Sequence, residues 1–128
     1  MGDDCISINL NAGERLLRKG RAKWITTVVD VYGRHDVVVR GTLFLTNMRL
    51  VFKKDWYIVG AGLPGQVDIW LSRVDSVRVG EAVYKWGFGS IRFGQGMGFT
   101  VVTTDGSKYR FATGDETEAW LKALREVG

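Results

Sequence analysis

Apolar and polar residues alternate with a period of two along most of the chain, which is the pattern of half-buried β-strands. In the first such run, 25–31, we expect positions 25, 27, 29 and 31 to face inward, while Thr26 and Asp30 face water. Further alternating runs occur at 37–45, 48–53, 67–72, 75–80, 82–93, 99–104 and 107–112. Turn-forming residues separate these runs, so the sequence predicts six to eight short strands in an antiparallel sheet.

The runs 37–45 and 48–53 close into a hairpin with a continuous apolar face. With Thr46 and Asn47 at the turn, Leu43 lies opposite Leu50. A slip of one residue would turn this face outward. The outward face of this hairpin is then expected to carry Arg40, Thr42, Phe44, Arg49, Val51 and Lys53.

A second hairpin turns at 105–106. A three-residue loop that ends in Gly106 suits a type I turn followed by a left-handed residue. This register places Phe99 opposite Phe111 on the inner side and directs the basic residues of the last strand outward.

The C-terminal segment changes to a helical period. Thr113 and Glu116 have the spacing of a capping box, in which the hydroxyl and the carboxylate accept hydrogen bonds from free N–H groups at a helix start. The apolar stripe of this helix consists of Trp120, Leu121, Leu124 and Val127. Because the sheet is the only partner available, we expect Trp120 and Leu124 to have structural roles against it. The sequence therefore predicts a mainly β fold with one C-terminal helix.

The composition suits a single soluble domain, with 128 residues, 45% hydrophobic and 25% charged. We expect a tail or extra strand over 1–10 and one domain over 11–128. Apolar runs are too short to span a bilayer, and the N-terminus lacks the features of a signal peptide, so we expect a cytoplasmic protein. Cys5 and His35 are the only cysteine and histidine, which excludes an intrachain disulfide and a Cys/His metal cluster. We expect no metal and no cofactor.

The segment 86–98, WGFGSIRFGQGMG, contains five glycines in thirteen residues and raises the question of a phosphate-binding loop. No Lys-Ser or Lys-Thr follows a glycine, and the next segment has the pattern of a strand. A Walker loop needs that lysine, and a dinucleotide site needs a helix N-terminus for the phosphate. We therefore expect a bulged connection between strands, and we expect no catalytic residues and no enzyme activity.

The net charge is +4, and ten Lys or Arg against three Asp or Glu fall between residues 14 and 54. A basic half suggests anionic partners such as membrane headgroups or nucleic acid; the alternative is a solvated surface that is merely basic. Trp56 and Tyr57 either meet a membrane interface or cover the core. Nucleic acid is the less favoured partner because the ribonucleoprotein signature is absent. The expected anion-binding residues are Lys23, Arg34, Arg40, Lys53 and Lys54.

The segment 41–52, GTLFLTNMRLVF, resembles the signature of GRAM domains and related pleckstrin-homology-like domains. The resemblance extends over about residues 10–127, from the AGERLL opening at 12–17 to the final helix with its tryptophan. It implies a seven-stranded, strongly bent antiparallel sheet or barrel that one C-terminal helix closes, with Trp120 as the plug. Members of this family commonly bind phosphoinositides, other membrane lipids or proteins and are not enzymes, and the GLUE branch binds ubiquitin as well.

Two functions are therefore expected. The first is a non-catalytic module that binds anionic membrane lipid through the cations listed above, at the periphery of a membrane. The second is a protein-interaction module, with ubiquitin as one conceivable partner. Its contact would be the outward face with Phe44 and Val51, or the long loop over 55–66.

Overall fold

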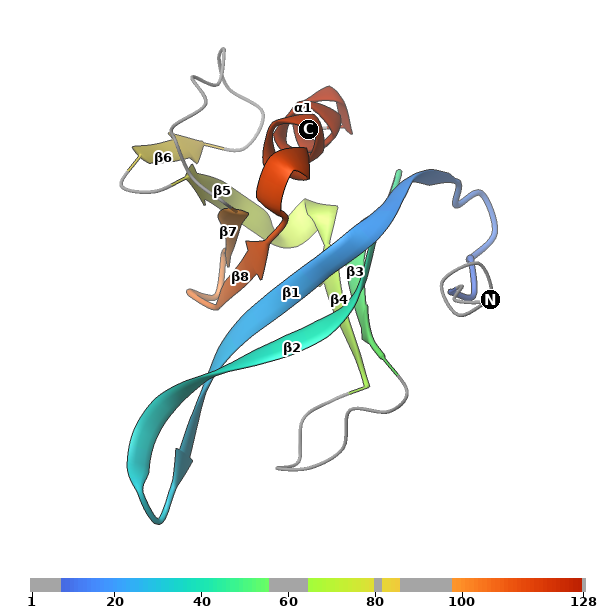
Figure 1. The fold of residues 1–128 in the computed structure, drawn as a ribbon. Coiled ribbons are helices and arrows are strands. Elements are labelled where there is room, and N and C mark those ends of the chain that lie inside the picture. Colours follow the sequence, from blue (N-terminus) through green and yellow to red (C-terminus); the bar gives the residue numbers. More distant parts are fainter. Residues whose placement is uncertain (1–7, 56–64, 80–81, 86–97, 128) are drawn as a thin grey trace.

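The computed structural model describes residues 8–55, 65–79, 82–85 and 98–127 of the chain. In this part, eight strands form one antiparallel sheet in the order β4-β3-β2-β1-β8-β7-β5-β6 (Figure 1). The strands are β1 (Leu16–Asp30), β2 (Gly33–Thr46), β3 (Arg49–Lys54), β4 (Gln66–Trp70), β5 (Val74–Val79), β6 (Ala82–Lys85), β7 (Gly98–Thr103) and β8 (Lys108–Ala112). The helical elements are the short 3-10 turns η2 (Leu71–Arg73) and η3 (Gly114–Glu116) and the helix α1 (Thr117–Val127).

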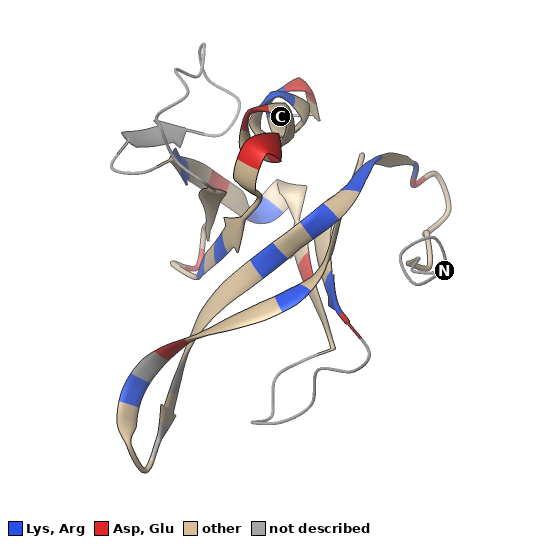
Figure 2. Cartoon of the chain, viewed as in Figure 1, with Lys and Arg blue, Asp and Glu red and all other residues tan. Residues whose placement is uncertain are grey.

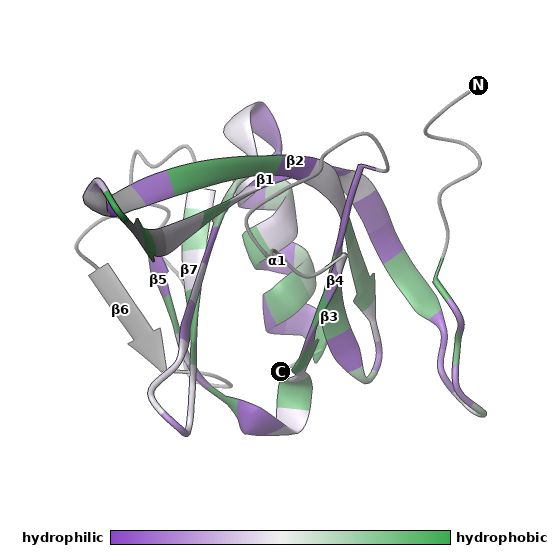
Figure 3. Cartoon of the chain, turned by 90° about the horizontal axis from the view of Figure 1, so that it is seen from below, coloured by the Kyte–Doolittle hydropathy of each residue, from purple (hydrophilic) through white to green (hydrophobic). Residues whose placement is uncertain are grey.

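The predicted mainly β fold with an antiparallel sheet and one C-terminal helix is confirmed. The sheet is open, since β4 and β6 form its two edges, and β6 brings the described strands to eight where the resemblance implies seven. Figure 3 shows the sheet bending around α1, with β1 and β2 on one side and the β3/β4 and β5/β7 strands flanking the helix. No helix in the described part of the chain is long and apolar enough to cross a membrane.

β1 and β2 form a hairpin that extends beyond the rest of the sheet (Figure 1). β1 pairs with β2 from Leu16 to Asp30, but with β8 only over 23–25. The strand starts at Leu16, whereas the predicted run starts at residue 25. The prediction missed the first half of the strand because this half lacks apolar alternation. Gly20 and Ala22, both small, occupy the inward positions there, and a Cβ on Gly20 would lie 3.4 Å from Cζ2 of Trp120.

The hairpin of β2 and β3 has the predicted faces but a register shifted by two residues. Leu45 pairs with Leu50 and Leu43 with Phe52, so the turn is centred on Asn47 and Met48. The hydroxyl of Thr46 causes this shift, since it accepts hydrogen bonds from the N–H groups of Met48 and Arg49, both at 3.0 Å. A shift of two residues preserves the side on which each side chain lies, so the inner apolar face remains.

The hairpin of β7 and β8 has the predicted register, with Phe99 opposite Phe111 and Val101 opposite Tyr109. Gly106 has a φ of +88°, a left-handed conformation that glycine adopts without a steric penalty. The N–H of Gly106 bonds the carbonyl of Thr103 at 3.0 Å and closes the turn.

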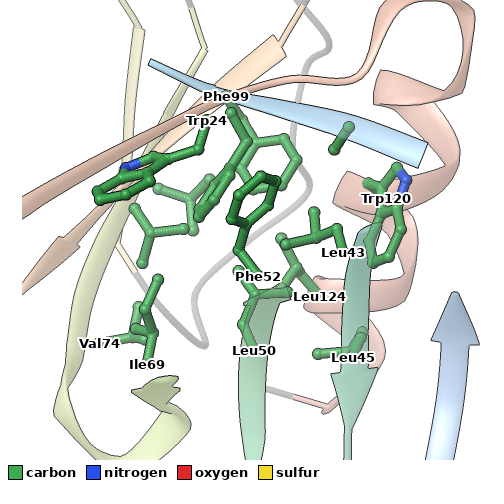
Figure 4. Packing of buried hydrophobic residues seen from close by; sticks show 14 of the residues in the cluster. Trp24, Leu43, Leu45, Leu50, Phe52, Ile69, Val74, Phe99, Trp120 and Leu124 are labelled. Carbon is green, nitrogen blue, oxygen red and sulfur yellow. The ribbon is translucent and has the colours of Figure 1, made fainter. Parts of the chain in front are cut away.

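Aromatic side chains from four strands meet at the centre of the core (Figure 4). The ring centroid of Phe52 lies 6.0 Å from that of Trp24 and 5.8 Å from that of Phe111, and Phe111 lies 5.8 Å from Phe99. Tilted rings at such distances have a favourable electrostatic contact in addition to their burial. Phe52 thus connects the β1–β3 half of the sheet to the β7–β8 half.

The helix α1 contributes its apolar stripe to this core. Trp120, Leu121 and Leu124 are 0%, 1% and 2% exposed. The predicted capping box is wrong, because Glu116 bonds Arg18 at 2.5 Å instead of a backbone N–H. The hydroxyl of Thr113 bonds the hydroxyl of Thr117 at 2.7 Å, and a 3-10 turn precedes the helix.

We expect Trp120→Ala to lower the free energy of unfolding by about 3–5 kcal/mol, because it leaves a large cavity between α1 and β1. Tyr32→Ala is the matched control, since Tyr32 is 92% exposed and surface substitutions change stability by about 0.5 kcal/mol or less. Chemical denaturation measures both. Equal losses in the two variants would contradict a core role for Trp120.

Candidate anion-binding site

Two of the five predicted cations, Lys23 and Arg40, lie directly opposite each other on β1 and β2. Both side chains are exposed, and the part of the chain that the structure describes supplies neither with a hydrogen bond or an ion pair. Opposed residues of an antiparallel pair have Cβ atoms about 5 Å apart, where like charges destabilise the sheet. Figure 2 shows the basic positions of β1 and β2 side by side.

A pocket of about 510 Å³ lies over this cation pair. It is lined by Arg21, Ala22, Lys23, Arg40, Ala112, Thr113 and Gly114. The strands supply its three cations, and the connection from β8 to η3 supplies backbone and a hydroxyl. Such a concave surface fits a small anionic group, since guanidinium and ammonium groups bind phosphate and carboxylate oxygens.

The third cation of the pocket, Arg21, was absent from the predicted site. Its guanidinium makes two parallel hydrogen bonds to Asp55, Nη1 to Oδ1 at 2.7 Å and Nη2 to Oδ2 at 2.6 Å. Nη1 also lies 3.2 Å from the hydroxyl of Thr42. Strict alternation places residue 21 on the same side of β1 as Lys23, a signal that the sequence already contained.

The other predicted cations lie outside the pocket. Lys53 pairs with Thr42, on the side of β2 that also carries Arg40, whereas Lys54 pairs with Gly41 and lies on the opposite side. Arg34 lies six residues further along β2, which is about 20 Å in an extended strand.

The tip of the β1–β2 hairpin carries exposed apolar side chains near Arg34. Val29 is 78% exposed, and Val31 and Tyr32 are each 92% exposed. Val29 lies opposite Arg34 in the register. Because alternate residues share a face, Lys23 and Val29 lie on one side of β1. One side of the hairpin therefore combines cations with apolar groups.

The expectation that Phe44 and Val51 face a partner is wrong, because they are 1% and 0% exposed. The Lys19 ammonium lies 5.7 Å from the centre of the Phe44 ring. Arg49, expected on the same outward face, is also buried. An outward platform of aromatic and cationic residues, on which single-stranded nucleic acid could stack, is therefore absent from β2 and β3. Trp56 and Tyr57, the glycine-rich 86–97 and most of the loop 55–66 lie outside the described residues.

A buried ionic network joins the chain before β1 to the turn between β2 and β3, and the sequence analysis missed it. Arg49 bonds the carboxylate of Glu14 through Nε at 2.9 Å and Nη2 at 3.1 Å, and Asp68 through Nη1 at 2.7 Å. The hydroxyl of Thr46 also donates to Glu14, at 2.6 Å. Hydrogen bonding to Arg49, followed by that to Thr46 and the N–H of Asn11, lowers the pKa of Glu14 to about 2.

The described residues contain no group of three or more His, Cys, Asp or Glu that could hold a metal ion. No protein-family model and no curated protein matches the sequence. Among solved structures, the chain is similar to the C-terminal domain of an unknown protein from Leishmania infantum. The two are 17% identical with a TM-score of 0.57, and the match covers 91% of this chain and 85% of that one. At this identity the similarity supports the fold alone.

We expect Glu14→Gln to destabilise the protein at neutral pH by about 3–5 kcal/mol, because it removes one partner of a buried ion pair. In the wild type, the stabilisation from the lowered Glu14 pKa is complete above about pH 4.5 and is lost as the pH falls towards 2. The stability difference between wild type and variant should therefore shrink over this range. Denaturation at several pH values measures it, and a constant difference would contradict the role of Glu14.

Proposed function

We propose that this chain is a non-catalytic binding module of the pleckstrin-homology/GRAM type that contacts anionic lipid headgroups. The observation that carries the proposal is the pocket in which Lys23 and Arg40 face each other across two strands. A bound phosphate would lower the repulsion between these cations and bond both. The strand order and the single C-terminal helix are consistent with this type of module.

The hairpin tip gives a second reason to favour a membrane over a small soluble anion. Exposed apolar residues beside a cation suit the boundary between headgroups and acyl chains. Val31 and Tyr32 would enter this boundary while Arg34 meets a headgroup. A membrane thereby accounts for both the cations and the apolar tip. Of the two surfaces expected for the competing protein-interaction function, the face with Phe44 and Val51 is buried, and most of the loop 55–66 lies outside the described residues.

We expect the protein to sediment with vesicles of phosphatidylcholine and phosphatidylserine at low salt, and to be released at high salt because ions screen surface charges. Lys23→Gln/Arg40→Gln should weaken this binding about thirtyfold, since each cation near an anionic surface contributes about 1 kcal/mol. Lys122→Gln/Arg125→Gln is the control, as it removes the same charge from exposed positions on α1. Equal weakening by both double variants would show that only net charge matters.

We expect Val31→Ser/Tyr32→Ser to weaken binding to the same vesicles and leave the free energy of unfolding unchanged. Both side chains are 92% exposed, so the folded protein loses little apolar contact. Vesicle sedimentation and chemical denaturation measure the two effects. Unchanged binding would mean that the tip stays in water, and the absence of wild-type binding to these vesicles at low salt would refute the membrane function.

A further inference from the structure

One cation of the pocket is already paired within the protein. Arg21 lines the pocket, yet its guanidinium is held by both oxygens of Asp55 at 2.6 and 2.7 Å. The Arg21 side chain is 42% exposed and the Asp55 side chain 5% exposed. A ligand in the pocket would therefore meet a cation whose charge is already compensated from the protein side.

Asp55 is fixed in this position by the backbone as well as by Arg21. Its N–H donates to the carbonyl of Arg40 at 3.0 Å, which ties the end of β3 to β2 beside the pocket. The buried carboxylate cannot turn into water without leaving Arg21 and breaking this geometry. The Asp55 carboxylate is therefore fixed beside Arg21.

We propose that Asp55 acts as an internal counter-ion that limits the pocket to ligands with a single phosphate group. This inference rests on the proposed function of the pocket as an anion site. Lys23 and Arg40 remain to neutralise one phosphate, whereas a further phosphate meets an Arg21 whose charge Asp55 already compensates. Because Coulomb energy is proportional to the ligand charge, the attraction to Arg21 that Asp55 cancels would be larger for a ligand with more phosphates.

The test compares inositol monophosphate with inositol trisphosphate by calorimetric titration. Asp55→Asn keeps the shape of the side chain and removes its charge, so Arg21 can bond the ligand. We expect this variant to bind inositol trisphosphate about five- to tenfold more tightly than the wild type, with a smaller gain for inositol monophosphate. Glu126→Gln makes the same change in net charge at an exposed position near the end of α1 and should change neither affinity.

The double variant Arg21→Gln/Asp55→Asn replaces the ion pair by two neutral amides. Because the pair is neutral as a whole, we expect both affinities to stay within about twofold of the wild type. Thermal unfolding of each variant establishes that it is folded. If the single variant were unfolded, a clear gain in trisphosphate affinity by the double variant would overturn the proposal, since no Arg21 cation is left to bind the additional phosphates.

The outcomes separate this inference from the proposed function. If the wild type binds the inositol phosphates and Asp55→Asn binds them with the same affinities, the role of Asp55 is overturned. The anion site itself is then still supported. Binding of inositol trisphosphate by Asp55→Asn but not by the wild type would support both. The absence of binding to either probe in every folded variant would overturn the anion site itself, and this inference with it.

Discussion

The long pairing of β1 with β2 is the interaction on which the rest of the structure depends. β1 lies between β2 and β8, so the two halves of the sheet are joined through it. Its inner side carries Gly20 and Ala22, which leave room for Trp120, while its outer side carries Arg21 and Lys23. A register slip of one residue would turn these cations towards the core. The packing of α1 and the proposed anion pocket therefore both depend on the pairing of β1 with β2.

The segment 41–52, on which the family resemblance rests, builds the fold rather than a ligand site. Gly41 allows β3 to approach, because a Cβ there would lie 2.3 Å from the carbonyl oxygen of Lys53. Thr46 shapes the turn, and Arg49 joins it to Glu14. None of Gly41, Thr46 and Arg49 lines the described pocket. A sequence pattern of this kind can be shared by domains that bind different partners, because it is maintained by packing and hydrogen bonding.

The inner side of β2, β3, β7 and β8 could be predicted from the sequence, and the outer side could not. On β1 the predicted inward side was wrong, because Val29 and Val31 are 78% and 92% exposed while Trp24 is buried. Alternation alone places Leu43 and Phe52 in the core, and this prediction tolerated a register error of two residues. Phe44 is buried on the outward face, and Arg49 is buried with Glu14, which lies 35 residues away in sequence. Local periodicity contains no information about such distant partners. For the same reason, the sequence predicted Lys23 and Arg40 as anion-binding residues but not the contact between Arg21 and Asp55, which lie 34 residues apart.

The cation pair also connects ligand binding to stability. Lys23 opposite Arg40 costs the sheet some electrostatic energy, and the described residues contain no carboxylate bonded to either. Arg49 shows the opposite solution in the same sheet, with Glu14 and Asp68 bonded to one guanidinium. In this fold, one arginine is fully compensated and another cation pair is open, which is the arrangement that the proposed anion would complete. Since such an anion would bind only the native register of β1 and β2, its binding free energy would add to the stability of the fold.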